Sequence, residues 1–351
     1  MSNLIIHIKG GTGNQLFQLA AGLSLANIYK KNCFFFAENI AKNKYSRKLE
    51  IRKLLKNLGV EEKTMNTSKK IIYLDQYDID HPLYFSKYSP LISINNDIKI
   101  EGDFTNYRLH NLEIINKIKL FIKNIKNREL DGIDYVAIHL RELHGSGTDQ
   151  IGKGVDCLNI NYYSEALSQI INNSSNKIKH AIVFCDTWKN INNSQLLPKL
   201  KNILNNLGVN YINGDKLIKS PLEIINIFLF AKFSIVSNST LSWWGAYLSE
   251  GYVFSPVMNL WEPNLKIPDH WKQIYTNEIS PKTHHNKLVF QPIIRNKQNA
   301  NFRIYSYKRI IIIKVFRKIS SKVNYFLKLK MFLKIIQYIG LLPENPNNTY
   351  N

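Results

Sequence analysis

Residues 235–247 read Ile-Val-Ser-Asn-Ser-Thr-Leu-Ser-Trp-Trp-Gly-Ala-Tyr, and we expect them to join a buried strand to a helix. The apolar run 224–236 predicts a helix and then a short strand over 233–237. The next helix is expected to begin around 243–245. A strand that ends in small hydroxyl residues and opens a helix gathers N–H groups and hydroxyls at one point, which suits an anion. The alternative is that the hydroxyls only cap the helix and that the tryptophans belong to the core.

The chain is long and strongly basic, with 351 residues and a formal net charge of +21. It can form two compact domains or one large α/β unit. The charge points to nucleic acid, an anionic membrane surface or a phosphorylated substrate. Residues 279–343 contain 14 Lys or Arg and no Asp or Glu, so two-thirds of the excess charge lies in this tail. Over 300–340, basic and apolar residues alternate, which predicts a helix on anionic lipid headgroups, a helix docked on the body, or a solvated tail.

The cysteine usage and the N-terminus concern the location of the protein. Cys33, Cys157 and Cys185 lie far apart and form neither a disulfide framework nor a metal motif, which fits a reducing cytosol. Residues 1–7 lack the basic start and long apolar core of a signal peptide, and no uncharged apolar stretch reaches about 18 residues. We therefore expect a cytoplasmic protein, peripheral on the inner face of the plasma membrane through its tail.

The N-terminal segment predicts the opening of a βα unit. A strand is expected over 4–9, and residues 10–18 then read Gly-Gly-Thr-Gly-Asn-Gln-Leu-Phe-Gln before an Ala/Leu-rich helix. The glycines allow a ligand to approach the backbone closely. Leu16 stands where a dinucleotide fingerprint needs a third glycine, and no Gly-Lys-Ser/Thr of a P-loop follows. Asn14 and Gln15 add amide side chains that can face a sugar or a base.

The rest of the chain indicates an α/β protein with two domains. Strands and helices alternate from residue 135 to about 256, which predicts a Rossmann-like sheet. We expect a βα domain in 1–130, a Rossmann-like domain in 131–280 and a basic amphipathic tail in 281–351. The other expected strands are 33–37, 99–104, 135–141, 180–184, 209–212 and 252–254, and the other expected helices are 19–29, 112–128, 161–171, 195–207 and one that starts at 221.

Several expected strands end in polar side chains. These are Asn14 and Gln15, His139 and Arg141, Asp186, and residues 238–242. Arg141 is suited to bidentate contact with phosphate, and the Asp186 carboxylate can accept two hydrogen bonds from a guanine edge. A purine nucleoside diphosphate is therefore a coherent ligand. Asp78 and Asp80 lie in a Tyr-rich loop, where they are metal ligands or solvated carboxylates. No metal site is expected from the strand ends.

At these residues the chain resembles the bacterial α-1,2-fucosyltransferases of glycosyltransferase family eleven. The resemblance covers about residues 4–275 and leaves out the tail. The motifs that carry it are residues 10–18, His139-x-Arg141, Phe184-x-Asp186 and residues 237–246, with support from residues 101–104, Asn161-x-Tyr163 and Pro268-x-x-Trp271.

The resemblance implies a GT-B fold, in which two Rossmann-like domains face a central cleft. It implies that GDP-fucose is the donor, that an oligosaccharide or lipid-linked glycan is the acceptor at O-2 of a galactoside, and that the configuration inverts. No cofactor, no metal and no nucleic acid is expected. Residues 1–130 would then form the acceptor side, and residues 131–280 would bind the sugar nucleotide.

The resemblance also implies roles for single residues. Arg141 would hold the donor β-phosphate and stabilise the leaving GDP, and His139 would orient Arg141 or touch the nucleotide. Asp186 would bind guanine. The other donor-binding residues would be Gly11, Gly13, Asn14, Gln15, Asn238, Ser239, Thr240 and Ser242.

The sequence departs from the family pattern directly after Arg141. The family reads His-x-Arg-Arg-Gly-Asp, whereas this chain has Glu142 for the second Arg and His144 for the Asp. His144 is an acceptor-side general base or a loop histidine. The departure leaves room for another GDP-sugar, such as a deoxyheptose or rhamnose, and for an inactive relative. An alternative from another class is a nucleic-acid-binding protein that acts through its basic tail.

Overall fold

The structure is a computed structural model that describes residues 2–37, 48–63, 71–75, 97–105, 107, 110–125, 130, 132–141, 158–173, 178–185, 194–256 and 267–274. All of them fall within one compact unit, Met1–Ile294. The second unit, Arg295–Asn351, lies outside the described residues, and with it the expected amphipathic helix over 300–340. The described part of the chain contains no helix long and apolar enough to cross a membrane.

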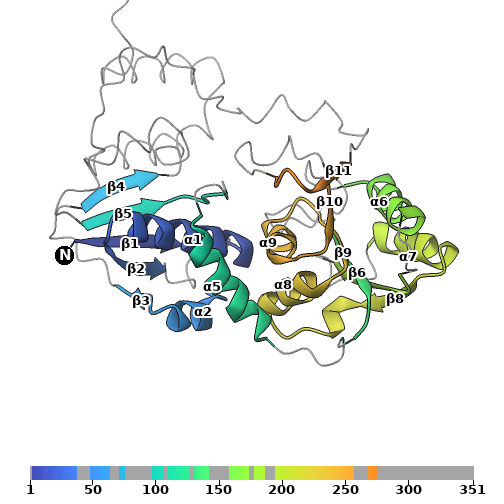
Figure 1. The fold of residues 1–351 in the computed structure, drawn as a ribbon, viewed down its shortest axis with the longest axis horizontal. Coiled ribbons are helices and arrows are strands. Elements are labelled where there is room, and N and C mark those ends of the chain that lie inside the picture. Colours follow the sequence, from blue (N-terminus) through green and yellow to red (C-terminus); the bar gives the residue numbers. More distant parts are fainter. Residues whose placement is uncertain are drawn as a thin grey trace, which may run out of the picture. The chain divides into compact units, whose positions relative to one another are not determined.

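Strands and helices alternate along much of the described chain, except that no described helix separates β3, β4 and β5 from one another, or β10 from β11 (Figure 1). The first part holds β1 (Asn3–Ile8), α1 (Thr12–Ile28), β2 (Asn32–Ala37), α2 (Arg52–Asn57), β3 (Glu61–Glu62), β4 (Ile71–Asp75), β5 (Asp97–Glu101) and α5 (Leu112–Lys123). The second part holds β6 (Tyr135–Leu140), α6 (Ile160–Asn173), β7 (His180–Cys185), α7 (Leu196–Asn206), β8 (Asn210–Asn213), the 3₁₀ turn η5 (Gly214–Lys216), α8 (Pro221–Phe230), β9 (Phe233–Ile235), α9 (Thr240–Leu248), β10 (Tyr252–Pro256) and β11 (Lys272–Ile274).

The described strands form two parallel sheets. The first has five strands in the order β3-β2-β1-β5-β4, and the second has six in the order β11-β10-β9-β6-β7-β8. Every pairing among the described strands is parallel. In the fully described units β1-α1-β2 and β9-α9-β10, a helix returns the chain before the next parallel strand. The expected α/β fold with two Rossmann-like sheets is confirmed.

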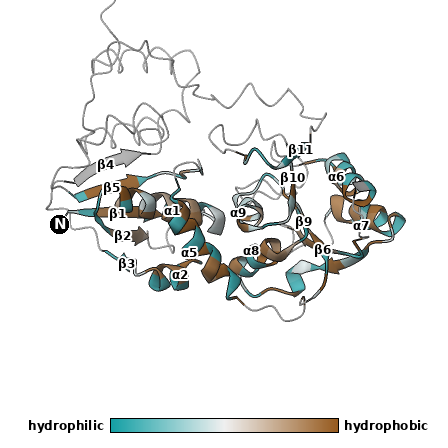
Figure 2. Ribbon diagram, viewed as in Figure 1, coloured by the Kyte–Doolittle hydropathy of each residue, from teal (hydrophilic) through white to brown (hydrophobic). Residues whose placement is uncertain are grey.

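A continuous hydrophobic core joins β1, α1 and α5 to α8 and α9. Trp243 and Trp244 are fully buried in it, and their ring centroids lie 4.7 and 5.0 Å from that of Phe17 on α1. The structure therefore supports the interpretation of these tryptophans as core residues. α8 is hydrophobic along its length and packs against α5 and α9 (Figure 2). Gly245 allows the close approach of α8, because a Cβ there would lie 2.4 Å from that of Phe228.

Two helices begin earlier than the sequence predicted. α9 begins at Thr240 and not at 243–245, because extended Ser239 accepts a hydrogen bond from Leu241 N–H at 3.3 Å and caps the helix. α1 begins at Thr12 and not at Leu19, so the glycine-containing stretch supplies its first turn. The strand β11 was not expected, because its three residues are too short to form a pattern.

Candidate functional site

The carboxyl ends of β6 and β9 lie side by side, because the two strands pair in register from Val136↔Phe233 to Ile138↔Ile235. The chain leaves β6 toward Arg141 and leaves β9 toward α9. A hydrogen bond between Ser237 Oγ and His139 Nδ1, 2.9 Å long, ties the two strand ends together. Two motifs that lie 98 residues apart are thereby brought to one edge of the sheet. This is the edge at which open α/β sheets bind ligands.

His139 is buried, and its ring is neutral at neutral pH. Burial, with a smaller contribution from the positive charge of Arg141, lowers the pKa of the imidazole to about 3. A neutral imidazole cannot supply positive charge to a bound anion. The charge at this strand end therefore comes from Arg141, and the contact with Ser237 is the structural role that the geometry gives to His139.

The backbone of Arg141 is held by a tyrosine of the following helix. Arg141 N–H donates to Tyr163 Oη at 3.3 Å, and the same hydroxyl donates to the His139 carbonyl at 3.2 Å. Tyr163 is fully buried, so its ring cannot change position without repacking the core. The first residue after β6 thus leaves the sheet in a fixed direction.

Tyr162 fastens the two neighbouring strands in a similar way. Its hydroxyl lies 2.6 Å from the carbonyl of Val236, which follows β9, and 3.1 Å from the carbonyl of Phe254, in the middle of β10. Asn159 Oδ1 accepts a hydrogen bond from Tyr162 N–H at 3.2 Å. Sequence reasoning missed Tyr162 and noted Tyr163 only through the family resemblance. The available signal was a tyrosine pair at the start of a helix that follows a buried strand.

The first turns of α1 and α9 are in direct contact. A Cβ built on Gly13 would lie 2.4 Å from the backbone carbon of Thr240 and 2.5 Å from its Oγ1, so only glycine fits at this position. Thr240 Oγ1 donates to Asn14 Oδ1 at 2.7 Å across 226 residues of chain. The predicted donor-binding residues Gly13, Asn14 and Thr240 are therefore neighbours.

Two helix N-termini that meet in this way favour an anion between or beside them. Each N-terminus carries partial positive charge and backbone N–H groups that have no acceptor within the helix. Neither α1 nor α9 has an acidic residue in its first turn, and the N-cap of α1, Gly11, offers no side chain. The favourable partner for both helix ends is therefore an external anion.

Other predicted residues are engaged by the backbone. Both hydrogens of the Gln15 amide are used, because Nε2 donates to the Gly10 and Lys48 carbonyls, both at 2.9 Å. Its Oε1 accepts from Glu50 N–H at 3.1 Å, so the amide of Gln15 ties a loop to α1. Ser242 Oγ donates to the Ser239 carbonyl at 3.3 Å within the first turn of α9. Asn238 is buried beside the helix cap.

Asp103 was not singled out from the sequence, but it lies beside Asn14. Asn14 Nδ2 donates to Asp103 Oδ1 at 3.3 Å. Burial raises the pKa of this carboxyl, and the charge of Lys9 and the hydrogen bond from Asn14 oppose that change. The signal that could have found Asp103 is its position as a carboxylate at the end of the expected strand 99–104.

Glu101 lies at the end of β5 and is surrounded by basic side chains. Its Oε1 is 3.2 Å from His7 Nδ1 and 2.8 Å from Lys9 Nζ, and its Oε2 is 3.9 Å from Lys99 Nζ. The pKa of this carboxyl lies well below its usual range, mainly because of the hydrogen bond with His7. The hydrogen bond and the positive charge of Lys9 lower this pKa further. Glu101 is therefore ionised and a weak base.

The described residues do not include Asp186, His144 or Glu142, so the roles predicted for these residues stay predictions. An acid that contacts the end of β7 was missed. Asp215 Oδ2 accepts a hydrogen bond from Cys185 N–H at 3.3 Å, at the end of β7. Within the ranges that the structure describes, no three His, Cys, Asp or Glu side chains lie close enough together to hold a metal ion.

No protein-family model matches the sequence, and no curated protein sequence matches it either. Solved structures similar to this chain include the fucosyltransferase NodZ from Bradyrhizobium, at 13% identity and a TM-score of 0.42 over 71% of this chain and 92% of that one. POFUT1 in complex with GDP-fucose is 8% identical, with a TM-score of 0.42 over 79% and 99% of the two chains. A FUT1 mutant of Arabidopsis thaliana in complex with GDP is 10% identical, with a TM-score of 0.40 over 73% and 70%. At this degree of similarity, the function has to be argued from the residues of the chain itself.

Proposed function

We propose that this protein is a glycosyltransferase that moves fucose from GDP-fucose to a hydroxyl, O-2 of a galactoside, in a surface polysaccharide or oligosaccharide. The observation that carries the proposal is the meeting of two helix N-termini at Gly13 and Thr240, next to the strand end that leads to Arg141. The sequence motifs at 10–18 and 237–246, which resemble family eleven, supply these same helix ends.

The donor diphosphate would bind at the N-termini of α1 and α9. Backbone N–H groups of both helices and the guanidinium of Arg141 would donate to its oxygens. Thr240 already gives its hydroxyl proton to Asn14, so its oxygen can only accept from the sugar or from water. Asp186 would accept hydrogen bonds from the guanine edge.

The chemistry is a displacement at the anomeric carbon. The bond from C1 to the β-phosphate oxygen breaks, and its electron pair stays on GDP. The acceptor oxygen forms the new bond on the opposite face, so the configuration inverts. Charge that builds on the leaving diphosphate is stabilised by Arg141 and the helix ends, in place of a divalent ion. The sugar has oxocarbenium character in the transition state.

The departures at Glu142 and His144 bear on the choice of sugar. Glu142 replaces a cation of the family pattern with a negative group, so the donor phosphates meet less positive charge than in the family. A panel of GDP-sugars that includes GDP-rhamnose and GDP-deoxyheptose identifies the donor. If one of these GDP-sugars is turned over and GDP-fucose is not, the proposed donor sugar is wrong and the proposed reaction type still holds.

The first test is calorimetric titration of the full-length protein with GDP, UDP and CMP in EDTA. Selective GDP binding is expected, and Arg141→Ala should weaken it by about 10-fold or more, because a hydrogen bond to a charged group contributes about 1.5–3 kcal/mol. Arg52→Ala is the matched control, because Arg52 is exposed and paired with Glu62 on β3. Equal binding of the three nucleotides would remove the guanine assignment, and a requirement for metal would remove the metal-free mechanism.

The second test is turnover. GDP-fucose mixed with lactose should yield GDP and a fucosylated trisaccharide, whose linkage and anomeric configuration are read by NMR. If no GDP-sugar of the panel is transferred or hydrolysed, the protein is not the enzyme proposed. Binding of GDP without turnover on a range of acceptors would instead support an inactive relative.

The proposed location is the cytoplasm, at the inner face of the plasma membrane. The support is the charge of residues 279–343, which contain 14 Lys or Arg and no acid, and the alternation of basic and apolar residues within 300–340. A lipid-linked glycan would then be presented at the same surface.

A further inference from the structure

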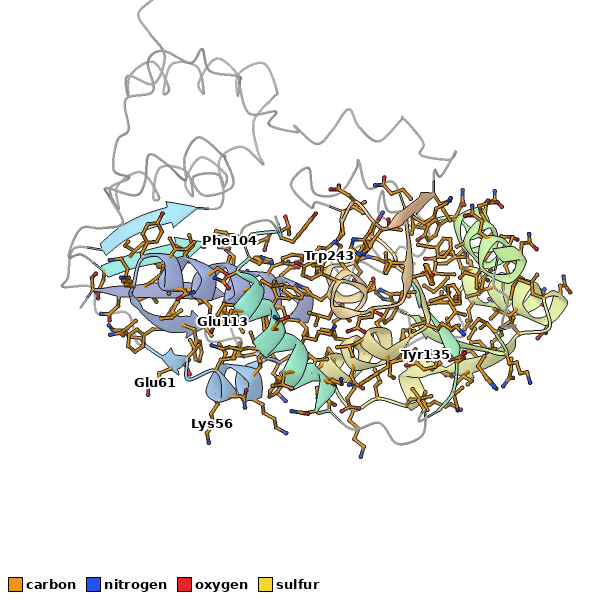
Figure 3. All side chains as sticks on the ribbon, viewed as in Figure 1. Lys56, Glu61, Phe104, Glu113, Tyr135 and Trp243 are labelled. Atoms are coloured by element: carbon orange, nitrogen blue, oxygen red, sulfur yellow. The ribbon has the colours of Figure 1, made fainter. Side chains whose placement is uncertain are left out.

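Asp103 stands on the turn that follows β5, at the same sheet edge as the loop into α1. β5 pairs with β1 in parallel register, with Ile100 opposite Ile6, so both strands deliver their next residues to one place. Phe104 follows Asp103 with a φ of 51° and is fully buried (Figure 3). A left-handed conformation is unfavourable for a residue other than glycine. The packed ring of Phe104 holds the turn in this conformation and fixes the backbone beside Asp103.

A chain of hydrogen bonds leads from Asp103 to the N-terminus of α9. Asp103 Oδ1 accepts from Asn14 Nδ2 at 3.3 Å, and Asn14 Oδ1 accepts from Thr240 Oγ1 at 2.7 Å. The amide of Asn14 is therefore oriented from both sides. Asp103 lies one side chain away from the helix ends at which the donor phosphates are proposed to bind.

The charges around Asp103 favour a carboxylate that can accept a proton. Burial raises its pKa, which makes it a stronger base than an exposed aspartate. The facing groups from neighbouring elements are Lys9 after β1, Asn14 on α1 and, through Lys9, Glu101 on β5. Glu101 is held ionised by His7 and Lys9 and is a poor proton acceptor. Among the described carboxylates at this edge of the first sheet, Asp103 is the better base.

We propose that Asp103 is the general base that removes the proton of the acceptor hydroxyl, an inference that rests on the proposed glycosyl transfer. As the acceptor oxygen forms its bond to C1, the O–H bond breaks and the proton passes to the Asp103 carboxylate. The C1–O bond to the diphosphate breaks with its electrons on GDP. No further reactant is required, and solvent takes the proton from Asp103 after the product leaves. Asn14 holds the carboxylate in place.

The test compares Asp103→Asn with the wild-type protein in steady-state transfer from GDP-fucose to lactose across pH. The asparagine keeps the oxygen that accepts from Asn14 but cannot take a proton. The expected result is a kcat at least about 100-fold lower, within the range that general bases contribute. In the wild type, kcat/KM should fall as pH drops below the raised pKa of Asp103, and in the variant this acidic limb should disappear. Asp103→Glu should retain part of the rate.

The control is Asp97→Asn, because Asp97 lies on the same strand at the opposite edge, where its Oδ1 accepts from Asn3 N–H at 2.9 Å. This variant should keep the wild-type rate and pH profile. Titration with GDP separates the two proposals, since Asp103→Asn should bind GDP as the wild type does. A wild-type enzyme that turns over while Asp103→Asn keeps its rate and its acidic limb would overturn the role of Asp103 alone. A wild-type protein without GDP binding or turnover would overturn the proposed function and this inference with it.

Discussion

At the scale of single residues, the carboxyl edge of the second sheet is fixed by side chains that bind backbone groups. Tyr163 bridges Arg141 N–H and the His139 carbonyl, and Tyr162 bonds to one carbonyl just after β9 and to another within β10. His139 adds a side-chain contact to Ser237. These residues hold the position from which the Arg141 side chain extends. An enzyme that stabilises a leaving diphosphate by charge depends on such fixed positions.

The variant Tyr163→Phe tests this positioning role. It removes the hydroxyl that bonds to Arg141 N–H and to the His139 carbonyl, so the free energy of unfolding should fall by about 1–3 kcal/mol, and GDP affinity and kcat should fall as well. Chemical denaturation, calorimetry and steady-state kinetics measure the three quantities.

Tyr135→Phe is the matched control for Tyr163→Phe. Tyr135 is buried at the opposite end of β6, and its hydroxyl donates to the Ile227 carbonyl at 2.8 Å (Figure 3). It should lose similar stability and keep GDP affinity. If both variants lose GDP affinity equally, Tyr163 contributes stability only.

At the scale of elements, the candidate site depends on two helices that begin at one point. α1 starts one turn after β1, and α9 starts one turn after β9, so both helices direct their N-termini to the carboxyl edges of their sheets. Gly13 permits the contact, and the pair of Asn14 and Thr240 bonds across it. Two N-termini placed together repel each other weakly through their partial charges, and a bound anion converts that cost into attraction.

The variant Gly13→Ala separates packing from helix propensity. Alanine normally stabilises a helix relative to glycine by about 0.5–1 kcal/mol. Here its Cβ would lie 2.4 Å from the Thr240 backbone, so we expect a loss of about 1–3 kcal/mol, as for other overpacked sites, together with weaker GDP binding. Asn27→Ala, at an exposed position of the same helix, should weaken neither stability nor GDP binding. A more stable Gly13→Ala protein would show that the helix ends are not in contact.

At the scale of the whole molecule, the charge is distributed unevenly. The chain carries a net charge of +21, and 14 basic residues without an acid lie in residues 279–343. The proposed donor site uses Arg141 and the N-termini of α1 and α9, none of which belongs to residues 279–343. A separation of this kind fits a protein whose body performs chemistry while another segment sets its location.

We expect the full-length protein to sediment with vesicles that contain phosphatidylglycerol and not with vesicles of phosphatidylcholine alone. Binding should weaken strongly as salt rises toward 1 M, where the screening length falls to about 3 Å. Competition with single-stranded RNA tests the alternative partner. Binding to RNA with no binding to anionic vesicles would contradict the membrane proposal and favour the nucleic-acid alternative.

Much of the fold follows from local patterns in the sequence. The strands β1, β6 and β7 and the helices α7 and α8 lie within a residue or two of their expected bounds, because apolar periodicity marks them clearly. The starts of α1 and α9 were wrong, because their first turns consist of small polar residues that also suit a loop. β11 was not predicted, because three residues are too few to show a hydrophobic pattern.

By itself, the sequence determined the alternation of strands and helices, the polar residues at strand ends and the concentration of charge in the tail, since each of these is a property of adjacent residues. Only the tertiary structure decided which polar residues meet. It joined Asn14 to Thr240 and to Asp103, and it turned Gln15 toward the backbone of a neighbouring loop. These contacts depend on how two sheets and their helices pack, and residues 226 positions apart leave no sign of their proximity in one sequence.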